Sequence, residues 1–470
     1  MPDSLAVAPA VKAARDALGE RDDVWIAGGA IRDALTGRQV RDADVVVPAE
    51  RVGESAKGIG KAARGHAFEL SAEHATWRVN PAGEEWHIDV TGMRGETIED
   101  DLRARDFTIN AIAVPVPGGE LIDPTGGLED MGSVLRAASD SAFEDDPLRL
   151  LRAVRFATEL PLEIERNTGQ LARSAAARAG DPAGERQFSE LRGIVAGRDA
   201  LRGVALMDEL GLTPVVLPEL ENLRGVVQNP NHHLDVHGHT LAVLEEWLGI
   251  EADLQGFAGE LADEVTRFLD EPLADELTRR AALRFGALFH DLGKPETREE
   301  GSGYVTFIGH DTAGARIIGE ICGRLRTSRR LSLHLQGLAL HHLRLGFLIH
   351  QRPLTRRTVY DYLAATEPVS ADVTLLTVAD RLAARGEGPL ASEEMVNAHL
   401  DLAREMLSEA LVWHREGPPR PPVSGEDLET ELGMKPGPEM GRVLEELRAE
   451  AFAGEIRGRD QALDRARSLL

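Results

Sequence analysis

At 470 residues the chain is long enough for two to four domains, and its 42% hydrophobic content allows sizeable cores. The single cysteine, Cys322, excludes an intrachain disulfide and a Cys-x-x-Cys metal site. The formal net charge of −26 argues against a nucleic-acid-binding surface over the whole molecule, so any phosphate contact must be local.

The N-terminal segment does not read as a secretory signal peptide, because no basic stretch precedes its short apolar run. No run approaches the ~18 apolar residues of a membrane span. We therefore expect a cytoplasmic protein with no membrane partner. These features leave the oligomeric state open.

Helix and strand patterns in chain order predict an α+β protein. Residues 1–20 have helical spacing of apolar side chains, and helical periodicity dominates again from about residue 129. Between them, strand-like runs alternate with turns, which predicts strands at 24–27, 43–47, 86–91, 108–116 and 120–122.

Turn-rich and proline-rich segments divide the helical remainder. Residues 217–235 contain many turn formers, and residues 414–427 form a proline-rich linker. The predicted parts are a head over 1–145, an all-α neck over 146–225, an all-α body over 226–413 and a helical tail over 424–470.

Charge is segregated within the predicted body. Residues 321–360 contain eight arginines and no acid, whereas residues 245–276 contain eleven acids and one arginine. Because arginine suits phosphate geometry, the first segment predicts a track for an RNA backbone. Ordinary patchiness of surface charge is the alternative.

The stretch "VWIAGGAIRDALTG" (24–37) predicts a strand, a glycine turn and a short helix. Gly28 and Gly29 would let the backbone approach a ligand, and the helix N-terminus would favour a phosphate group. A purely structural turn is the alternative interpretation.

A pair of carboxylates follows in "RDADVVV" (41–47). Asp42 and Asp44 point the same way if they lie on a strand, and they repel unless a cation lies between them. Carboxylate oxygens suit Mg²⁺, and two such ions can clamp an in-line displacement at phosphorus. Asp89 in "EWHIDVTG" is the candidate third carboxylate, with Glu96 as its competitor. A solvated strand end is the alternative for the pair.

These residues and the motifs that follow resemble the class II tRNA CCA-adding and bacterial poly(A) polymerase family. The family pattern G-G-x-[IV]-R-D matches residues 28–33, and D-x-D matches residues 42–44. Later family blocks match "RARDFTINA" (103–111), "DPTGG" (123–127), "DDPLRLLRAVRF" (145–156) and "ERQFSEL" (185–191).

The resemblance implies a polymerase-β-like nucleotidyltransferase head with a small mixed sheet. It implies template-independent addition of C, C and A to the 3′ end of tRNA from CTP and ATP, with Mg²⁺ held by Asp42 and Asp44. The implied nucleotide-binding residues are Gly28, Gly29, Arg32, Asp33, Arg105, Asp106, Asn110, Asp146, Arg149, Arg152 and Arg155.

Asp146 and Arg149 are three residues apart, which predicts one helix face that reads the base by accepting and donating hydrogen bonds. Arg152 and Arg155 extend that helix and would hold phosphate. A surface salt bridge, worth ~0.3–0.5 kcal/mol, is the alternative. The chain departs from the family at Ala104, where arginine is usual, and at Asp145, where glutamate is usual.

The body contains "HHLDVHGHTLAVLE" (232–245) and "ALRFGALFHDLGKP" (282–295), which resemble the HD phosphohydrolase superfamily. The implied ligands are His239, His290, Asp291 and Asp380, with His310 and His342 completing a two-metal site and His341 as an alternative to His342. This donor set suits Mn, Ni, Fe or Zn more than Mg. We interpret the remaining histidines of these segments as surface or core residues: His232, His233, His237 and His334.

The leading functional hypothesis is CCA addition, with a possible phosphatase or 2′,3′-cyclic phosphodiesterase activity in the body. A poly(A) polymerase, or an enzyme that adds only A or only CC, is the close alternative. An HD phosphohydrolase with a non-catalytic head and a non-catalytic RNA-binding protein are more distant alternatives.

Overall fold

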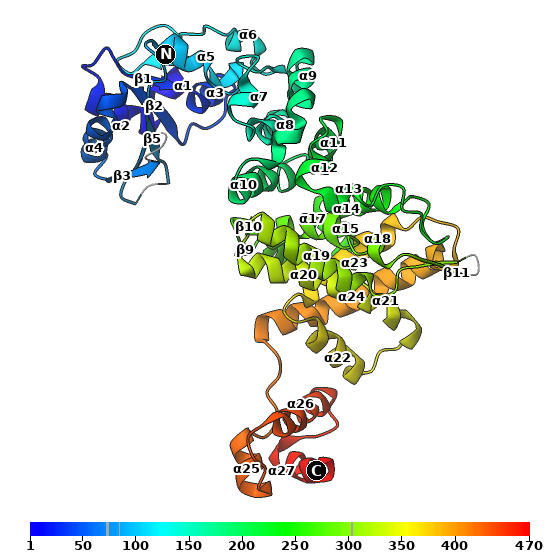
Figure 1. The fold of residues 1–470 in the computed structure, drawn as a ribbon. Coiled ribbons are helices and arrows are strands. Elements are labelled where there is room, and N and C mark those ends of the chain that lie inside the picture. Colours follow the sequence, from blue (N-terminus) through cyan, green and yellow to red (C-terminus); the bar gives the residue numbers. More distant parts are fainter. Residues whose placement is uncertain (72–74, 84, 302–303) are drawn as a thin grey trace. The chain divides into compact units, whose positions relative to one another are not determined.

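The computed structural model describes residues 1–71, 75–83, 85–301 and 304–470. The chain divides into two compact units, Met1–Val216 and Leu217–Leu470 (Figure 1). The first mixes a sheet with helices and the second is almost entirely helical, so the predicted α+β class is confirmed. In the described ranges, no helix is both long enough and apolar enough to cross a membrane.

The first unit contains a six-stranded mixed sheet with the order β3-β4-β5-β2-β1-β6. Only β2 and β5 pair in parallel; the other neighbours are antiparallel. The strands are β1 (Trp25–Ala27), β2 (Ala43–Val47), β3 (His66–Ser71), β4 (Thr76–Asn80), β5 (Ile88–Gly92) and β6 (Ala113–Pro115).

Alternation along β2 separates two cores. Val45 and Val47 pack in the large core with helices α2 (Pro9–Leu18) and α4 (Val52–Ala62). Val46 packs in a smaller core with Ile98 and Leu102 of helix α5 (Ile98–Arg103). Asp44 therefore projects from the α5 side of the sheet, because side chains two residues apart share a face.

Most of the predicted strands are confirmed, with three differences. Residues 108–110 form a 3-10 helix, Ile122 makes only an isolated bridge to Ala113, and the hairpin of β3 and β4 was not predicted. Among the helices, the predicted N-terminal helix is two helices, α1 (Asp3–Ala6) and α2, because Pro9 starts the second.

The rest of the first unit is mainly helical. Its elements are α3 (Gly29–Leu35), η1 (Ala49–Arg51), η2 (Thr108–Asn110), α6 (Gly127–Asp130), β7 (Val134–Leu135), α7 (Ala142–Asp145), α8 (Arg149–Glu159), β8 (Glu163–Ile164), α9 (Arg166–Ala175), η3 (Ala176–Gly180), α10 (Gly184–Val195), α11 (Ala200–Glu209) and α12 (Thr213–Val216). Helix α8 packs against α10 and α11.

The second unit begins with α13 (Pro218–Glu221) and is built around α14 (Val236–Ala252), α17 (Arg279–Phe289), α19 (His310–Arg324), α20 (Arg329–His341), α23 (Ser370–Ala383) and α24 (Glu393–Glu416). Shorter elements connect them: α15 (Leu254–Ala258), η4 (Gly259–Leu261), α16 (Ala262–Leu269), β9 (Pro272–Ala274), β10 (Leu277–Thr278), α18 (Lys294–Thr297), β11 (Glu299–Gly301), β12 (Tyr304–Thr306), α21 (Arg344–Leu348), η5 (Ile349–Gln351), α22 (Arg356–Thr366) and η6 (Pro389–Ala391). The tail helices α25 (Gly425–Leu432), α26 (Pro438–Ala453) and α27 (Gly458–Leu469) enclose a small core of their own.

Candidate active sites

Two of the predicted head carboxylates lie side by side in the sheet. Asp44 on β2 is the direct register partner of Asp89 on β5. Both line a pocket of about 550 Å³ together with Asp101, Arg94 and Arg105. Burial raises the pKa of the Asp44 carboxyl; the charge of Arg105 opposes this rise and that of Asp89 adds to it. A divalent cation here would offset the cost of a half-buried carboxylate pair.

Asp42 lies one residue before β2 and is held by His87. The backbone N–H and Nδ1 of His87 lie 2.9 and 2.7 Å from Asp42 Oδ1. Arg78 donates two hydrogen bonds of 2.8 Å to Asp89. Asp42 and Asp89 are thus each tied to a neighbouring side chain. Unlike Asp44 and Asp89, Asp42 is not among the residues that line the pocket.

Gly28 brings the backbone against this pocket. Its φ of +78° is a left-handed conformation, and a Cβ there would lie 2.7 Å from Arg105 Nη1 and 3.0 Å from Asp44 Oδ2. Only glycine fits both the conformation and the contact. The turn between β1 and α3 therefore meets the predicted metal-binding carboxylate directly.

The pocket contains one acid that the sequence analysis missed. Asp101 of α5 is buried and lies 3.0 Å from Arg94 Nε and 3.2 Å from Arg105 Nε. Glu96, the predicted competitor of Asp89, is exposed and is not among the residues that line the pocket. The i,i+4 spacing of Asp101 and Arg105 was the available signal.

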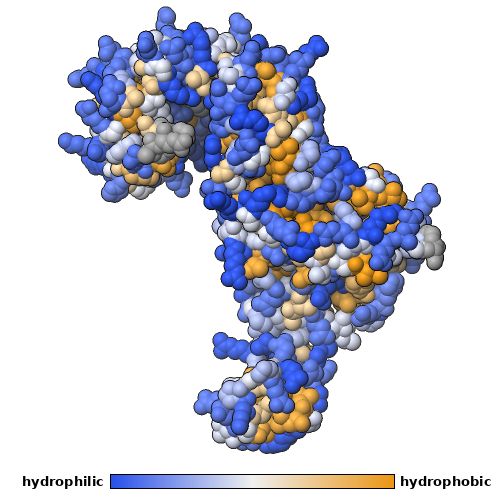
Figure 2. All heavy atoms as spheres, in the orientation of Figure 1, coloured by the Kyte–Doolittle hydropathy of each residue, from blue (hydrophilic) through white to orange (hydrophobic). Residues whose placement is uncertain are grey.

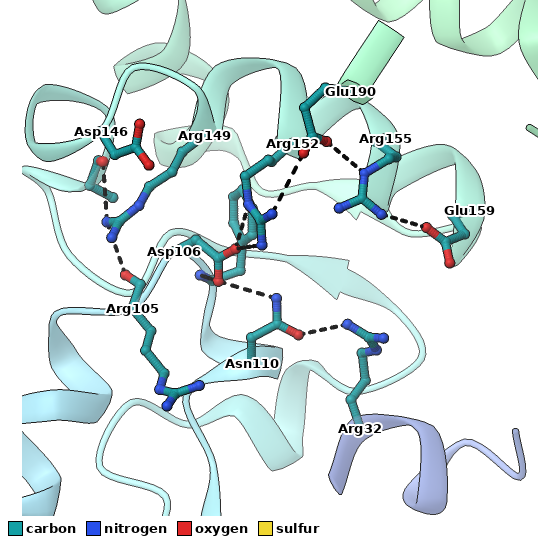
Figure 3. A network of polar contacts seen from close by, with 12 residues as sticks. Arg32, Arg105, Asp106, Asn110, Asp146, Arg149, Arg152, Arg155, Glu159 and Glu190 are labelled. Carbon is teal, nitrogen blue, oxygen red and sulfur yellow. Dashed lines mark hydrogen bonds and ion pairs between the residues drawn. The ribbon is translucent and has the colours of Figure 1, made fainter. Parts of the chain in front are cut away.

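A polar network joins three of the family blocks (Figure 3). Arg32 donates to Asn110 Oδ1 at 2.8 Å and also contacts the adjacent Asp33. Asn110 and Arg152 both donate to Asp106, at 3.1 and 2.7 Å. Burial alone would raise the pKa of Asp106, but the charge and hydrogen bonds of Arg152 and Asn110 bring it below its ordinary value.

Arg155 connects α8 to α10. Its Nε donates to Glu190 Oε2 at 2.6 Å and its Nη1 to Glu159 at 3.0 Å. Glu190 also lies 3.6 Å from Arg152. The two arginines predicted to hold phosphate are therefore paired with acids of the protein.

The predicted helix face of Asp146 and Arg149 is wrong. Asp146 has φ −144° and ψ 102° and lies outside α8, because Pro147 disfavours a helical conformation in the residue before it. Its carboxylate accepts a 3.2 Å bond from Arg186 of α10. Arg149 begins α8 and donates to the carbonyls of residues 104, 105 and 142.

Five helical elements of the second unit converge on a histidine- and aspartate-rich centre. Two groups of three have all their donor atoms within 4.8 Å of one another. One comprises His239, His290 and Asp380; the other comprises Asp291, His310 and His342. The structure therefore brings all six predicted HD residues together, and we call these groups the two HD triads. No other such group occurs in the described part of the chain.

Backbone carbonyls orient three of the histidines. The Nδ1 atoms of His290, His310 and His342 lie 2.9, 2.7 and 2.6 Å from the carbonyls of residues 287, 307 and 339. Since a carbonyl only accepts, each Nδ1 carries a proton and Nε2 is the ring atom left to act as a ligand. The Nε2 atoms of His310 and His342 lie 3.3 Å apart. His341, the alternative to His342, is instead bonded to Arg344 and lies outside both triads.

Charge at this centre suits a divalent ion. Burial lowers the pKa of His342 to about 4, which keeps its imidazole neutral. Burial would raise the pKa of Asp291, but His290 and Lys294, whose Nζ lies 2.6 Å from Oδ2, hold it well below its usual range. Asp291 Oδ1 and His290 Nε2 are buried without hydrogen-bond partners. A neutral imidazole at His342 beside an ionised carboxylate at Asp291 forms a donor pair that transition metals favour.

His232 was predicted to be a surface or core residue, but it lies at this centre. It lines a cavity of about 560 Å³ with Asp291, Lys294 and Asp380, and its ring centroid lies 4.6 Å from that of His239. No sequence signal marks it, because its position depends on a loop that is hydrogen-bonded to residues 386–390.

Half of the arginines in the segment 321–360 are paired with acids. Four of its eight arginines form ion pairs with acids from elsewhere in the chain or from one turn away. These pairs are Arg324–Glu219, Arg352–Glu405, Arg356–Glu409 and Arg357 with Asp361 and Glu446. The local absence of acids is therefore offset by tertiary contacts.

Three segments of the chain match known protein families. Residues 24–135 match the poly A polymerase head domain, and residues 253–385 match the HD domain. Residues 161–223 match a family described as the probable RNA and SrmB-binding site of polymerase A. Both predicted resemblances are thereby confirmed.

Curated relatives match most of the chain. An A-adding tRNA nucleotidyltransferase of Deinococcus radiodurans is 36% identical over 92% of each chain. A CC-adding tRNA nucleotidyltransferase of Thermus thermophilus is 31% identical over 94% of this chain and 92% of its own. A multifunctional CCA protein of Nitrosococcus oceani is 30% identical over 70% of this chain and 75% of its own.

Solved structures share the fold. A CCA-adding enzyme in complex with ATP has a TM-score of 0.64 at 21% identity and covers 99% of this chain and 98% of its own. The Thermotoga maritima CCA-adding enzyme bound to tRNA has a TM-score of 0.58 at 20% identity, and the match covers 95% of this chain and 90% of that enzyme's chain. The sequence relatives show that the chain belongs to the family of tRNA nucleotidyltransferases, and the family match over residues 253–385 shows that it carries an HD domain.

Proposed function

We propose that the protein adds C, C and A to the 3′ end of tRNA from CTP and ATP, by nucleotidyl transfer in the head pocket. The observation that carries the proposal is the close approach of Gly28 to Asp44 and Arg105, which both line one pocket. The glycine turn and the N-terminus of α3 would face the triphosphate, and Arg105 would offset its charge. Family membership favours this reaction over a non-catalytic head.

Asp42 and Asp44, with Asp89 as the third carboxylate, would hold Mg²⁺. Bound Mg²⁺ would supply charge neutralisation at phosphorus and a more acidic 3′-hydroxyl. In the transfer, the 3′ oxygen bonds to the α-phosphorus, pyrophosphate leaves and the hydroxyl proton goes to solvent. Asp33, Arg32 and Gly29 would support the triphosphate side of this arrangement.

For base selection we propose Asp146 as the acceptor from the exocyclic amine of C or A, with Arg149 as donor. Asp106, Asn110, Arg152 and Arg155 would act as the framework that positions them. Arg186 fixes the Asp146 carboxylate at 3.2 Å, which supports a defined acceptor position.

Sequencing of product 3′ ends tests the proposal. Transfer RNA that lacks its terminal CCA is incubated with CTP, ATP or both. Full CCA addition requires both nucleotides, and we expect CC with CTP alone. The relatives include A-adding and CC-adding enzymes. Product restricted to A or to CC would identify such an activity instead, and long A tracts would identify a poly(A) polymerase.

We further propose that the two HD triads hydrolyse phosphate esters, with a 2′,3′-cyclic phosphate or a phosphate monoester as substrate. The donor set suits Mn, Ni, Fe or Zn, or Mg, and bound metal would supply an acidified water. A water oxygen would bond to phosphorus as a phosphorus–oxygen ester bond breaks, with the proton going to the leaving oxygen. Loss of hydrolysis in Asp291→Asn, with tRNA extension retained, is the expected result; retained hydrolysis would contradict the proposal.

We also propose a cytoplasmic location. The single cysteine is buried, in helix α19, and unpaired, as expected in a reducing compartment.

A further inference from the structure

The cavity that holds the HD triads has an apolar rim. Tyr304, Ile308 and Phe347 line it and are 56%, 82% and 69% exposed. Ile308 and Phe347 are the two most exposed large apolar side chains described in Leu217–Leu470. Hydrophobic surface is visible around α21 in Figure 2. Because single exposed apolar residues are ordinary, their gathering at one cavity is the informative feature.

Exposed aromatic rings are concentrated at this rim. Among the described Phe, Tyr and Trp residues, only Phe68, Tyr304 and Phe347 are exposed, and two of the three line the HD cavity. A phosphate group makes no use of an aromatic face. A nucleobase does, and stacking on such a ring is worth about 1–3 kcal/mol per base.

Short segments of chain connect both rings to metal-binding candidates. Tyr304 starts β12, and the carbonyl of Phe307 at the end of this segment accepts from His310 Nδ1 at 2.7 Å. Phe347 lies on α21, five residues after His342. The two rings are therefore placed relative to the triads by the same segments that place their histidines. The cavity, at about 560 Å³, is of the size that takes a small ligand.

We propose that Tyr304 and Phe347 form a nucleobase-binding subsite of the HD cavity, so that the site selects the terminal nucleotide of an RNA over a phosphate ester without a base. The inference rests on the proposed hydrolytic function of the HD triads. Phe347 also lines an adjoining cavity of about 300 Å³ with Arg344 and Tyr362. That cavity gives the preceding nucleotide a place beside a cation.

Paired substrates test the subsite. Hydrolysis of adenosine 2′,3′-cyclic phosphate is compared with that of glycerol 1,2-cyclic phosphate, which has no base. We expect Phe347→Ala and Tyr304→Ala each to lower the ratio of the two kcat/KM values about tenfold, from the loss of about 1.4 kcal/mol of stacking. Phe347→Trp should restore the ratio. Leu333→Ala, an exposed aliphatic change on α20 away from the cavity lining, is the matched control. An unchanged ratio overturns the proposal.

A binding measurement separates this inference from the proposed hydrolysis. If the wild-type protein hydrolyses neither these compounds nor a phosphate monoester, the hydrolytic proposal fails, and equilibrium dialysis with adenosine 3′-monophosphate decides the subsite. About tenfold weaker binding to Phe347→Ala than to Leu333→Ala supports it. Equal dissociation constants overturn it. Nucleotide bound by the head is common to both variants and cancels.

Discussion

Gly28 is the residue on which the geometry of the head pocket depends most closely. Its left-handed φ and the 2.7 Å separation that a Cβ would have from Arg105 Nη1 are two separate constraints. Gly37 shares the first constraint, with φ +73°, but nothing lies within 4 Å of a Cβ there. The two glycines therefore separate backbone strain from close approach.

We predict that Gly28→Ala lowers nucleotide incorporation into tRNA at least about tenfold, whereas Gly37→Ala leaves it within about twofold. Gly37→Ala should lose about 1 kcal/mol of folding free energy, because alanine is strained in the left-handed region, and Gly28→Ala should lose at least as much, because its Cβ also meets Arg105. Incorporation rates and urea unfolding measure the two effects. Equal activity of the two variants would contradict the close approach as the cause.

Single residues also show where sequence reasoning stops. The carboxylates on β2 and β5 were predictable, because strand alternation fixes which side chains share a face. The prediction that Asp146 shares a helix face with Arg149 was wrong. It applied helical spacing across Pro147, although a proline disfavours helical backbone in the residue before it. His232 was missed because a tertiary loop contact places it.

At the scale of elements, α8 is held to the rest of the first unit by its arginines. Arg152 donates two bonds to Asp106, whose side chain is buried, and approaches Glu190 on α10. Removing the arginine would leave Asp106 charged and without its main partner. Arg178, which pairs with Asp181 at the surface, offers the contrasting case.

We predict that Arg152→Ala lowers the free energy of unfolding by about 3 kcal/mol, because an uncompensated buried charge remains. Arg178→Ala should lower it by at most about 0.5 kcal/mol. The pKa of Asp106 lies below its ordinary value of 3.8, so the contribution of this carboxylate is present above that pH and is lost as the pH falls through the lowered value. Urea titrations at pH 7 and pH 3 check both statements; equal losses in the two variants at pH 7 would be inconsistent with them.

Element prediction succeeded where local patterns decide the structure. The buried runs of β1, β2 and β5 and the glycine turn were predictable from apolar residues and the turn-forming residues that bound them. Residues 108–110 have strand-like side chains, yet they form a turn of 3-10 helix where Thr108 Oγ1 donates to Asp130 at 2.7 Å. That partner is distant in sequence, so the pattern could not reveal it.

At the scale of the whole molecule, acids that are distant in sequence neutralise arginines of the segment 321–360. The arginines of 321–360 looked free because no acid lies among them in sequence, but Arg357 donates to Glu446 of α26 at 3.0 and 2.9 Å. The same contact fastens the tail to α22. An arginine in this position contributes to the packing of the second unit.

We predict that Arg357→Ala leaves the affinity for tRNA within about twofold, since a paired guanidinium adds little to phosphate binding. Its melting temperature should fall slightly, by the loss of a partly exposed ion pair worth up to about 1 kcal/mol. Filter binding at fixed salt and calorimetry measure the two quantities. A tenfold loss of affinity would restore the RNA-track interpretation.

The central claim is that the carboxylates of Asp44 on β2 and Asp89 on β5 take part in nucleotidyl transfer. The most direct test is the single-turnover rate of nucleotide incorporation into tRNA by Asp44→Asn, with Asp140→Asn, an exposed change in the same unit, as the isosteric control. We predict a loss of about 10³-fold for Asp44→Asn, equivalent to about 4 kcal/mol, and a rate within about twofold of wild type for Asp140→Asn. An Asp44→Asn rate within about tenfold of wild type would contradict the account.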